Sequence, residues 1–185
     1  MEEIQELYKR HFGHSPAVCQ LLQESGSNRR NYRLTGDGTP SVIGTVGTVI
    51  EENEAFRAIS AHGVSKGLNL PEVLAVSEDG FCYLQEDLGE STLYDLLAEQ
   101  RRLGRYDDNS RRMLADVMRA LPRLQFELGA GFDFSVCYPQ ESLDRRGILF
   151  DLNYFKYCFL KLTGVQFSET SLQDDFENLA DGSLA

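Results

Sequence analysis

The chain has 185 residues, 42% of them hydrophobic, which is enough for one good-sized domain or two small lobes. Its formal net charge of −11 argues against broad binding to the phosphate backbone of nucleic acids. No apolar run approaches the roughly 20 residues of a membrane-spanning helix, and the acidic first residues lack the layout of a signal peptide. We therefore expect a cytoplasmic protein that binds neither nucleic acid nor membrane.

The first half of the chain alternates between helical and strand patterns. Apolar residues at helical spacing predict helices over 2–12 and from Glu51 to about His62. Short apolar runs between turn residues predict strands over 17–22, 30–35, 41–46, 73–77 and 81–85. Gly36-Asp37-Gly38 and Glu78-Asp79-Gly80 are expected to be hairpin turns. This order predicts an α+β fold, with a five-stranded antiparallel sheet and one packed helix over residues 1–88.

After residue 90 the pattern is helical. Ser91 or Thr92 is expected to cap a helix that runs to about Gln100, and a second helix over 110–128 is expected to kink near Pro122. Two more helices are predicted around 148–160 and 172–179. Their aromatic cluster is expected to be core, or a surface that packs on further residues: Phe150, Tyr154, Phe155, Tyr157 and Phe159. Residues 89–185 thus form a second, helical part.

The cysteines and acidic residues do not suggest a metal site. The four cysteines are far apart and form no C-x-x-C pair, so a zinc site is not expected and mostly buried, reduced thiols are predicted: Cys19, Cys82, Cys137 and Cys158. Asp151 and Asn153 are interpreted as part of a solvated helix face rather than as metal ligands.

A loop of small residues joins the first two predicted strands. Gly26 removes the side chain that would keep backbone N–H groups away from phosphate oxygens, so Ser25–Asn28 are candidates for phosphate contacts. The alternative is an ordinary hairpin connection. The order of the segments that follow favours phosphate contacts.

Four segments resemble the aminoglycoside phosphotransferase/choline kinase-like family, whose members have the protein-kinase-like fold. Residues 24–34 (ESGSNRRNYRL) resemble its nucleotide loop, and residues 51–56 (EENEAF) resemble its helix with the ion-pair glutamate. Residues 70–74 (LPEVL) and 83–89 (YLQEDLG) look like its fourth and fifth strands and its hinge. The resemblance covers about residues 15–128 and is greatest to bacterial kinases that phosphorylate amino sugars.

The resemblance implies a kinase N-terminal lobe that binds ATP and, in the whole protein, a small hydroxylated substrate such as a sugar or amino sugar. Loop backbone would cover the phosphates, a strand lysine held by a helix glutamate would grip them, and hinge backbone would bind adenine. The residues implied are Ser25, Gly26, Ser27, Asn28, Arg29, Arg30, Arg33, Glu52, Glu54, Glu86, Asp87 and Leu88.

Two features depart from the family pattern. The third predicted strand, Pro40–Val46, contains no lysine, so Arg29, Arg30 or Arg33 is expected to supply the positive charge. No Asp in the chain is followed by Asn five residues later, and no His-x-Asp triplet occurs. We therefore expect the N-terminal portion of a longer kinase, with part of a truncated C-lobe. No catalytic or metal-binding residue is assigned, and Mg²⁺ is expected only with the missing C-terminal part.

Other interpretations remain open at this point. The same departures favour a non-catalytic kinase-like binding or regulatory module, and a generic interaction protein is the third class. Glu51, Glu52 and Glu54 are also expected at a solvated helix start, Arg29 and Arg30 as a surface pair, and Glu86 and Asp87 as an acidic turn. Exposed apolar surface over 148–179 is expected to drive self-association if the C-lobe is cut short.

Overall fold

The computed structural model describes residues 1–23 and 28–184. Contacts between residues divide the chain into two units, Met1–Tyr138 and Pro139–Ala185. These units are the compact parts of the chain. The domain boundary that the sequence predicts near residue 88 is a separate matter and stays a prediction.

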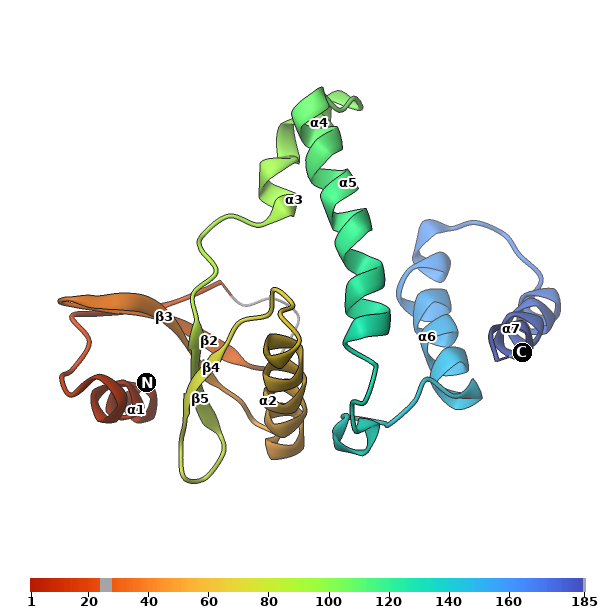
Figure 1. Cartoon of the computed structure of the whole chain (residues 1–185). Helices are drawn as coiled ribbons and strands as arrows, with labels where there is room; N and C mark the ends of the chain where they lie inside the picture. The colour runs from red at the N-terminus through yellow and green to blue at the C-terminus, as the bar shows by residue number, and fades with distance from the viewer. Residues whose placement is uncertain (24–27, 185) are drawn as a thin grey trace. The chain divides into compact units, whose positions relative to one another are not determined.

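The first unit contains a five-stranded antiparallel sheet in the order β1-β2-β3-β5-β4 (Figure 1). The strands are β1 (Val18–Leu21), β2 (Arg30–Gly36), β3 (Thr39–Val46), β4 (Val73–Val76) and β5 (Cys82–Glu86). Gly38 and Gly80, at φ of +73° and +75°, lie in the two predicted hairpin turns, because glycine adopts this left-handed conformation without a steric penalty. The predicted α+β class and five-stranded antiparallel sheet are confirmed.

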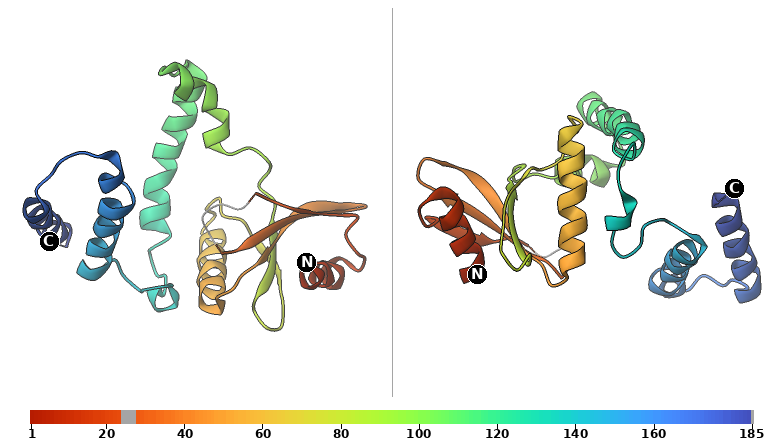
Figure 2. Two further views of the ribbon diagram at one scale, coloured as in Figure 1. Left: turned by 180° about the vertical axis from the view of Figure 1, so that it is seen from behind. Right: turned by 60° about the horizontal axis from the view of Figure 1, so that its bottom comes forward.

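Helices α1 (Glu2–Phe12) and α2 (Ile50–Ser65) lie on opposite faces of this sheet (Figures 1 and 2). The two-residue period of β2 divides its side chains between the faces. Tyr32 and Leu34 are buried with Ile4 and Tyr8 of α1, and the Tyr8 hydroxyl lies 2.7 Å from the Thr39 hydroxyl. The sheet thus packs a helix on each face, one more than expected.

The start of α2 is fixed by a buried amide. The Asn53 side chain is fully buried and donates hydrogen bonds to the carbonyl oxygens of Gly80, at 3.0 Å, and Phe81, at 3.2 Å. One turn later, Phe56 stacks on Tyr83 of β5 with ring centroids 5.2 Å apart. These contacts fix the orientation of the first turns of α2, which carry the predicted ion-pair glutamates.

The rest of the first unit is helical, with α3 (Leu93–Leu96), α4 (Ala98–Leu103) and α5 (Asp108–Pro122). Thr92 caps α3 as predicted, in a capping box with Asp95, but Leu97 at φ −95° and ψ 5° separates two short helices where one was expected. Pro122 keeps helical angles, and because it lacks an N–H the chain continues as a π-helix over Arg123–Glu127. Pro122 therefore marks a change of helix type within the predicted 110–128 segment.

The second unit consists of α6 (Arg145–Cys158), a 3-10 turn (Leu160–Thr163) and α7 (Glu169–Ser183). Glu169 at the start of α7 pairs with Lys156 and Lys161, and Arg145 pairs with Glu177 and Asp181. The aromatic cluster is exposed, with Phe150 at 69% and Tyr154 at 64% exposure, so of the two predicted alternatives the core is wrong and a surface is what the structure shows. The buried contacts come from Phe176 and Ala180 of α7.

α1 approaches β3 closely at Gly44, which provides a test of this packing. A Cβ atom at residue 44 would collide with Ile4 and lie 2.7 Å from Leu34 Cδ1. We expect Gly44→Ala to lower the free energy of unfolding by about 1–3 kcal/mol, measured by urea denaturation.

Ile4→Ala supplies the control. It opens space beside residue 44, so the double variant is expected to be less destabilised than the sum of the two single variants. Strict additivity of the two changes would contradict the proposed contact between α1 and β3.

Candidate functional site

The loop predicted to cover the phosphates is only partly described. Ser25, Gly26 and Ser27 lie outside the described residues, whereas Asn28 is exposed at the end of the loop. The residues that follow Asn28 carry the described part of the candidate site.

Arg29 forms an ion pair with the first turns of α2. Its Nη2 atom lies 3.1 Å from Glu52 Oε1 and donates to the Glu52 carbonyl oxygen at 3.0 Å. Its guanidinium also lies over the Phe56 ring, 5.6 Å from the centroid. The Arg29 side chain is only 17% exposed, so a largely buried cation stands beside the predicted loop and opposite a helix glutamate.

The neighbouring candidates are placed differently. Arg30 is exposed, and its guanidinium makes no hydrogen bond or ion pair with the parts of the chain that the structure describes. Glu54 is exposed and lies 3.7 Å from Arg57 one turn along α2. Of the two predicted ion-pair glutamates, Glu52 is therefore the one that faces the arginine next to the loop.

Arg33 lies in a hydrogen-bond network with the connector that follows β5. Its Nε donates to Asp87 Oδ2 at 2.6 Å, and its Nη2 donates to Asp87 Oδ1 at 3.0 Å and to the Gly89 carbonyl oxygen at 2.9 Å. Ser41 of β3 also donates to Asp87, at 2.6 Å. A more exposed contact joins Arg33 to Glu90 at 3.3 Å. The network links β2 and β3 to residues 87–90.

Gly89 is required by the geometry of this connector. At φ +104° it turns the chain so that its N–H donates to Asp87 Oδ1 at 3.0 Å while its carbonyl oxygen accepts from Arg33. Burial alone would raise the pKa of Asp87, but hydrogen bonds from Arg33, Ser41 and the Gly89 amide outweigh this and lower it below its ordinary value. Asp87 is therefore a buried carboxylate with its charge fully compensated.

The other two hinge candidates differ in their side chains and backbone. Glu86 Oε2 accepts a hydrogen bond from the Glu72 amide at 3.2 Å, and the Glu86 amide donates to the Glu72 carbonyl oxygen at 2.9 Å. Leu88 is 71% exposed, and no hydrogen bond joins its backbone N–H or C=O to another described residue. Both residues line a cavity of about 390 Å³ with Val64, Leu68, Asn69, Leu70 and Glu72.

One face of the sheet carries both ion pairs. Arg29, Asn31 and Arg33 are two residues apart along the chain, and the register places Asn31 beside Thr45 and Arg33 beside Ile43. The Thr45 hydroxyl donates to Asn31 Oδ1 at 2.8 Å, and the next partner of Thr45 is Tyr83, on which α2 packs. Counting this alternation in the sequence places Arg29 and Arg33 on one face and Ser41 of β3 on the same face, whereas Gly89 and Asn53 carry no comparable signal.

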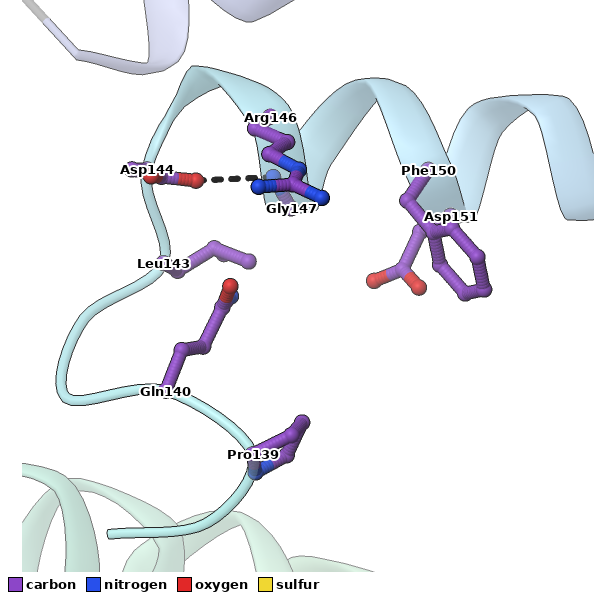
Figure 3. Close-up of a pocket in the computed structure, with 8 residues that line it drawn as sticks. All are labelled: Pro139, Gln140, Leu143, Asp144, Arg146, Gly147, Phe150 and Asp151. Carbon is purple, nitrogen blue, oxygen red and sulfur yellow. Dashed lines mark hydrogen bonds between the residues drawn. The ribbon is translucent and has the colours of Figure 1, made fainter.

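A cavity of about 690 Å³ lies in the second unit at the start of α6 (Figure 3). Its lining combines apolar side chains with Gln140, Asp144, Arg146 and Asp151, and the Asp144 carboxylate accepts from the Gly147 amide at 2.8 Å. None of the predicted site residues lines this cavity, and Asp144 is engaged as the cap of α6.

The described residues contain no group of three or more His, Cys, Asp or Glu side chains that could hold a metal ion. The prediction of mostly buried thiols is wrong: Cys82 is buried, Cys19 and Cys137 are half-buried, and Cys158 is exposed. Burial raises the pKa of the Cys82 thiol to about 11, so this thiol is unreactive at neutral pH.

Over the residues with described positions, no helix is long and apolar enough to cross a membrane.

Comparison with known proteins identifies no family. No family model matches the chain, and no curated protein matches it in sequence. The resemblance to the phosphotransferase family therefore stays an expectation, and the geometry around Arg29, Glu52, Arg33 and Asp87 is what a functional proposal has to explain.

The charge of Asp87 is expected to make the first unit less stable in acid. Because the folded pKa is depressed below the unfolded value of about 3.9, the network contributes fully at neutral pH and is lost as pH falls through the folded pKa. At pH 7, Asp87→Asn is expected to lower the free energy of unfolding by about 2 kcal/mol, measured by urea denaturation.

The difference between the wild type and this variant is expected to shrink as the pH falls below the unfolded pKa of about 3.9 and through the lower folded pKa. Glu90→Gln is the matched control, since Glu90 is exposed and its contact with Arg33 is expected to be worth less than about 1 kcal/mol. An equal difference at pH 7 and pH 3 would contradict this role for the Asp87 charge.

Proposed function

We propose that the first unit contains the nucleotide-binding lobe of an ATP-dependent phosphotransferase of the aminoglycoside phosphotransferase/choline kinase-like class. The observation that carries the proposal is the ion pair between Arg29 and Glu52. It joins a cation at the end of the loop between β1 and β2 to the first turns of the helix between β3 and β4. In kinases of this type, a lysine held by a helix glutamate serves the same purpose.

Arg29 takes the role of the absent strand lysine in this proposal. A cation held in place in a partly desolvated position stabilises phosphate charge without reorganising when the nucleotide binds. Glu52 keeps the guanidinium in position, and backbone N–H groups of residues 25–28 complete the phosphate site. Arg33, whose guanidinium is bound to Asp87, belongs to the other end of the site.

The connector at 86–88 takes the role of the hinge. It comprises the last residue of β5, Glu86, and the two residues that follow, and Glu86 pairs in register with Val42 of β3. Adenine would bind to backbone groups of Leu88, and for this binding the side chains of the hinge matter less than its conformation.

The phosphate acceptor is proposed to be a small hydroxylated molecule, of the sugar or amino-sugar class. This part rests on the resemblance of residues 24–34, 51–56 and 83–89 alone. Because no Asp–x₄–Asn spacing occurs in the 185 residues, the base and the metal ligands of phosphoryl transfer are not assigned to this chain. The same fact favours, as a second candidate, a kinase-like module that binds nucleotide without turnover.

The nucleotide site is tested by titrating the chain with ATP, with and without Mg²⁺, and following thermal unfolding. A ligand that binds only the folded state stabilises it by about 2.7 kcal/mol at one hundred times Kd. We expect Arg29→Gln to weaken ATP binding about ten- to hundredfold, because a charge-assisted hydrogen bond of about 1.5–3 kcal/mol is lost.

Arg30→Gln is the matched control: it removes the same charge from the adjacent, exposed residue and is expected to leave ATP binding within about twofold. Equal losses in both variants would assign the effect to overall charge rather than to the ion pair with Glu52. No saturable shift in the wild-type chain would overturn the proposal of a nucleotide site.

Self-association through the second unit remains a separate proposal. It is supported by the exposed aromatic face of α6 and the residues after it, where Tyr157 is 56% and Phe159 is 58% exposed. Sedimentation at high concentration is expected to show a dimer that Tyr154→Ser or Phe150→Ser weakens. A clean monomer would count against it.

A further inference from the structure

The connector after β5 is held at both sides of Leu88, and this carries an inference about nucleobase recognition. We propose that Arg33 and Asp87 are positioning residues that fix the connector for binding a nucleobase, and so make the site prefer a nucleoside triphosphate over triphosphate alone. The inference rests on the proposed function, which it deepens by separating a base end of the site from a phosphate end.

The first step is the completeness of the hydrogen bonding around Asp87. Its carboxylate accepts two hydrogen bonds from Arg33, one from the Ser41 hydroxyl and one from the Gly89 amide. Because β3 lies between β2 and β5 in the sheet, these bonds tie the connector to two neighbouring strands. The Asp87 and Arg33 side chains are 7% and 17% exposed, so water competes little for them.

The second step concerns the backbone groups of the connector that the network leaves free to bind a ligand. Asp87 and Gly89 are anchored, whereas Leu88 between them is exposed and its N–H and C=O make no hydrogen bond to any residue the structure describes. A donor and an acceptor on the same residue suit the edge of a nucleobase, which presents the complementary pair of groups. Holding such groups in place before binding removes an ordering cost from the affinity.

The third step is the separation of the two ends. Arg29 and Arg33 lie on one face, four residues apart, and extended backbone advances about 3.3 Å per residue, or roughly 13 Å over this distance. A nucleoside triphosphate is long enough to span it. A change at Asp87 should therefore affect the base and spare the phosphates.

The experiment compares ATP with inorganic triphosphate as ligands of the full chain, by calorimetric titration. In the wild type, ATP is expected to bind more tightly than triphosphate. Asp87→Asn is expected to lower ATP affinity about tenfold or more and to leave triphosphate affinity within about twofold, so that the ratio of the two affinities collapses. Amide hydrogen exchange at Gly89, whose N–H donates to Asp87, is expected to accelerate in the same variant.

Glu90→Gln is the matched control, because it removes only the exposed outer contact of Arg33, and it is expected to keep the ratio unchanged. Ser41→Ala removes one of the hydrogen bonds to Asp87, and it gives a graded loss if Asp87→Asn folds poorly. Equal weakening of ATP and triphosphate, or no weakening of either, would overturn the inference while leaving the nucleotide site intact. A wild-type chain that binds neither ligand would overturn the proposed function itself.

Discussion

The two-residue period of β2 is the constraint on which the rest of the first unit depends. Tyr32 and Leu34 are buried against α1, and the alternate residues Asn31 and Arg33 necessarily face the other way. A shift of the register by one residue would place the Arg33 guanidinium in the apolar core and lose the α1 contacts at once. The strand register therefore determines both the packing against α1 and the placement of the two ion pairs.

Both arginines bring charge into partly dry surroundings, which is costly unless an opposite charge is supplied at close range. The partners come from far along the chain: Glu52 is 23 residues beyond Arg29, and Asp87 is 54 residues beyond Arg33. Each pair thus joins β2 or its preceding loop to a later element, α2 in one case and the connector in the other. Formation of these pairs requires the whole sheet to be in place, so site and fold are coupled.

This distance along the chain also explains what could be predicted. Strand alternation and turn glycines locate five strands, and helical spacing locates α1 and α2, because these signals are local. The partners of Arg29 and Arg33 are distant in the sequence, so local patterns do not reveal them. In the sequence, only the charge of Arg33 makes it a candidate for phosphate contact. The departures from the predicted helices are also local to single residues. The backbone angles of Leu97 end α3, and Pro122, which lacks an N–H, precedes the π-helix. The spacing of apolar residues carries no signal for either change.

In the proposed nucleotide site, the geometry between β3 and α2 gives a reason why the cation would come from the loop. Thr45 of β3 is 2% exposed, donates to Asn31 and pairs with Tyr83, whose ring stacks on Phe56 of α2. A strand lysine there would place a strongly hydrated ammonium among buried aromatic carbons. The planar guanidinium of Arg29, which is more weakly hydrated, instead lies over the Phe56 ring from outside the strand and reaches Glu52. The stacked pair of Phe56 and Tyr83 is thus compatible with an arginine above the Phe56 ring, but not with a lysine on the strand beside it.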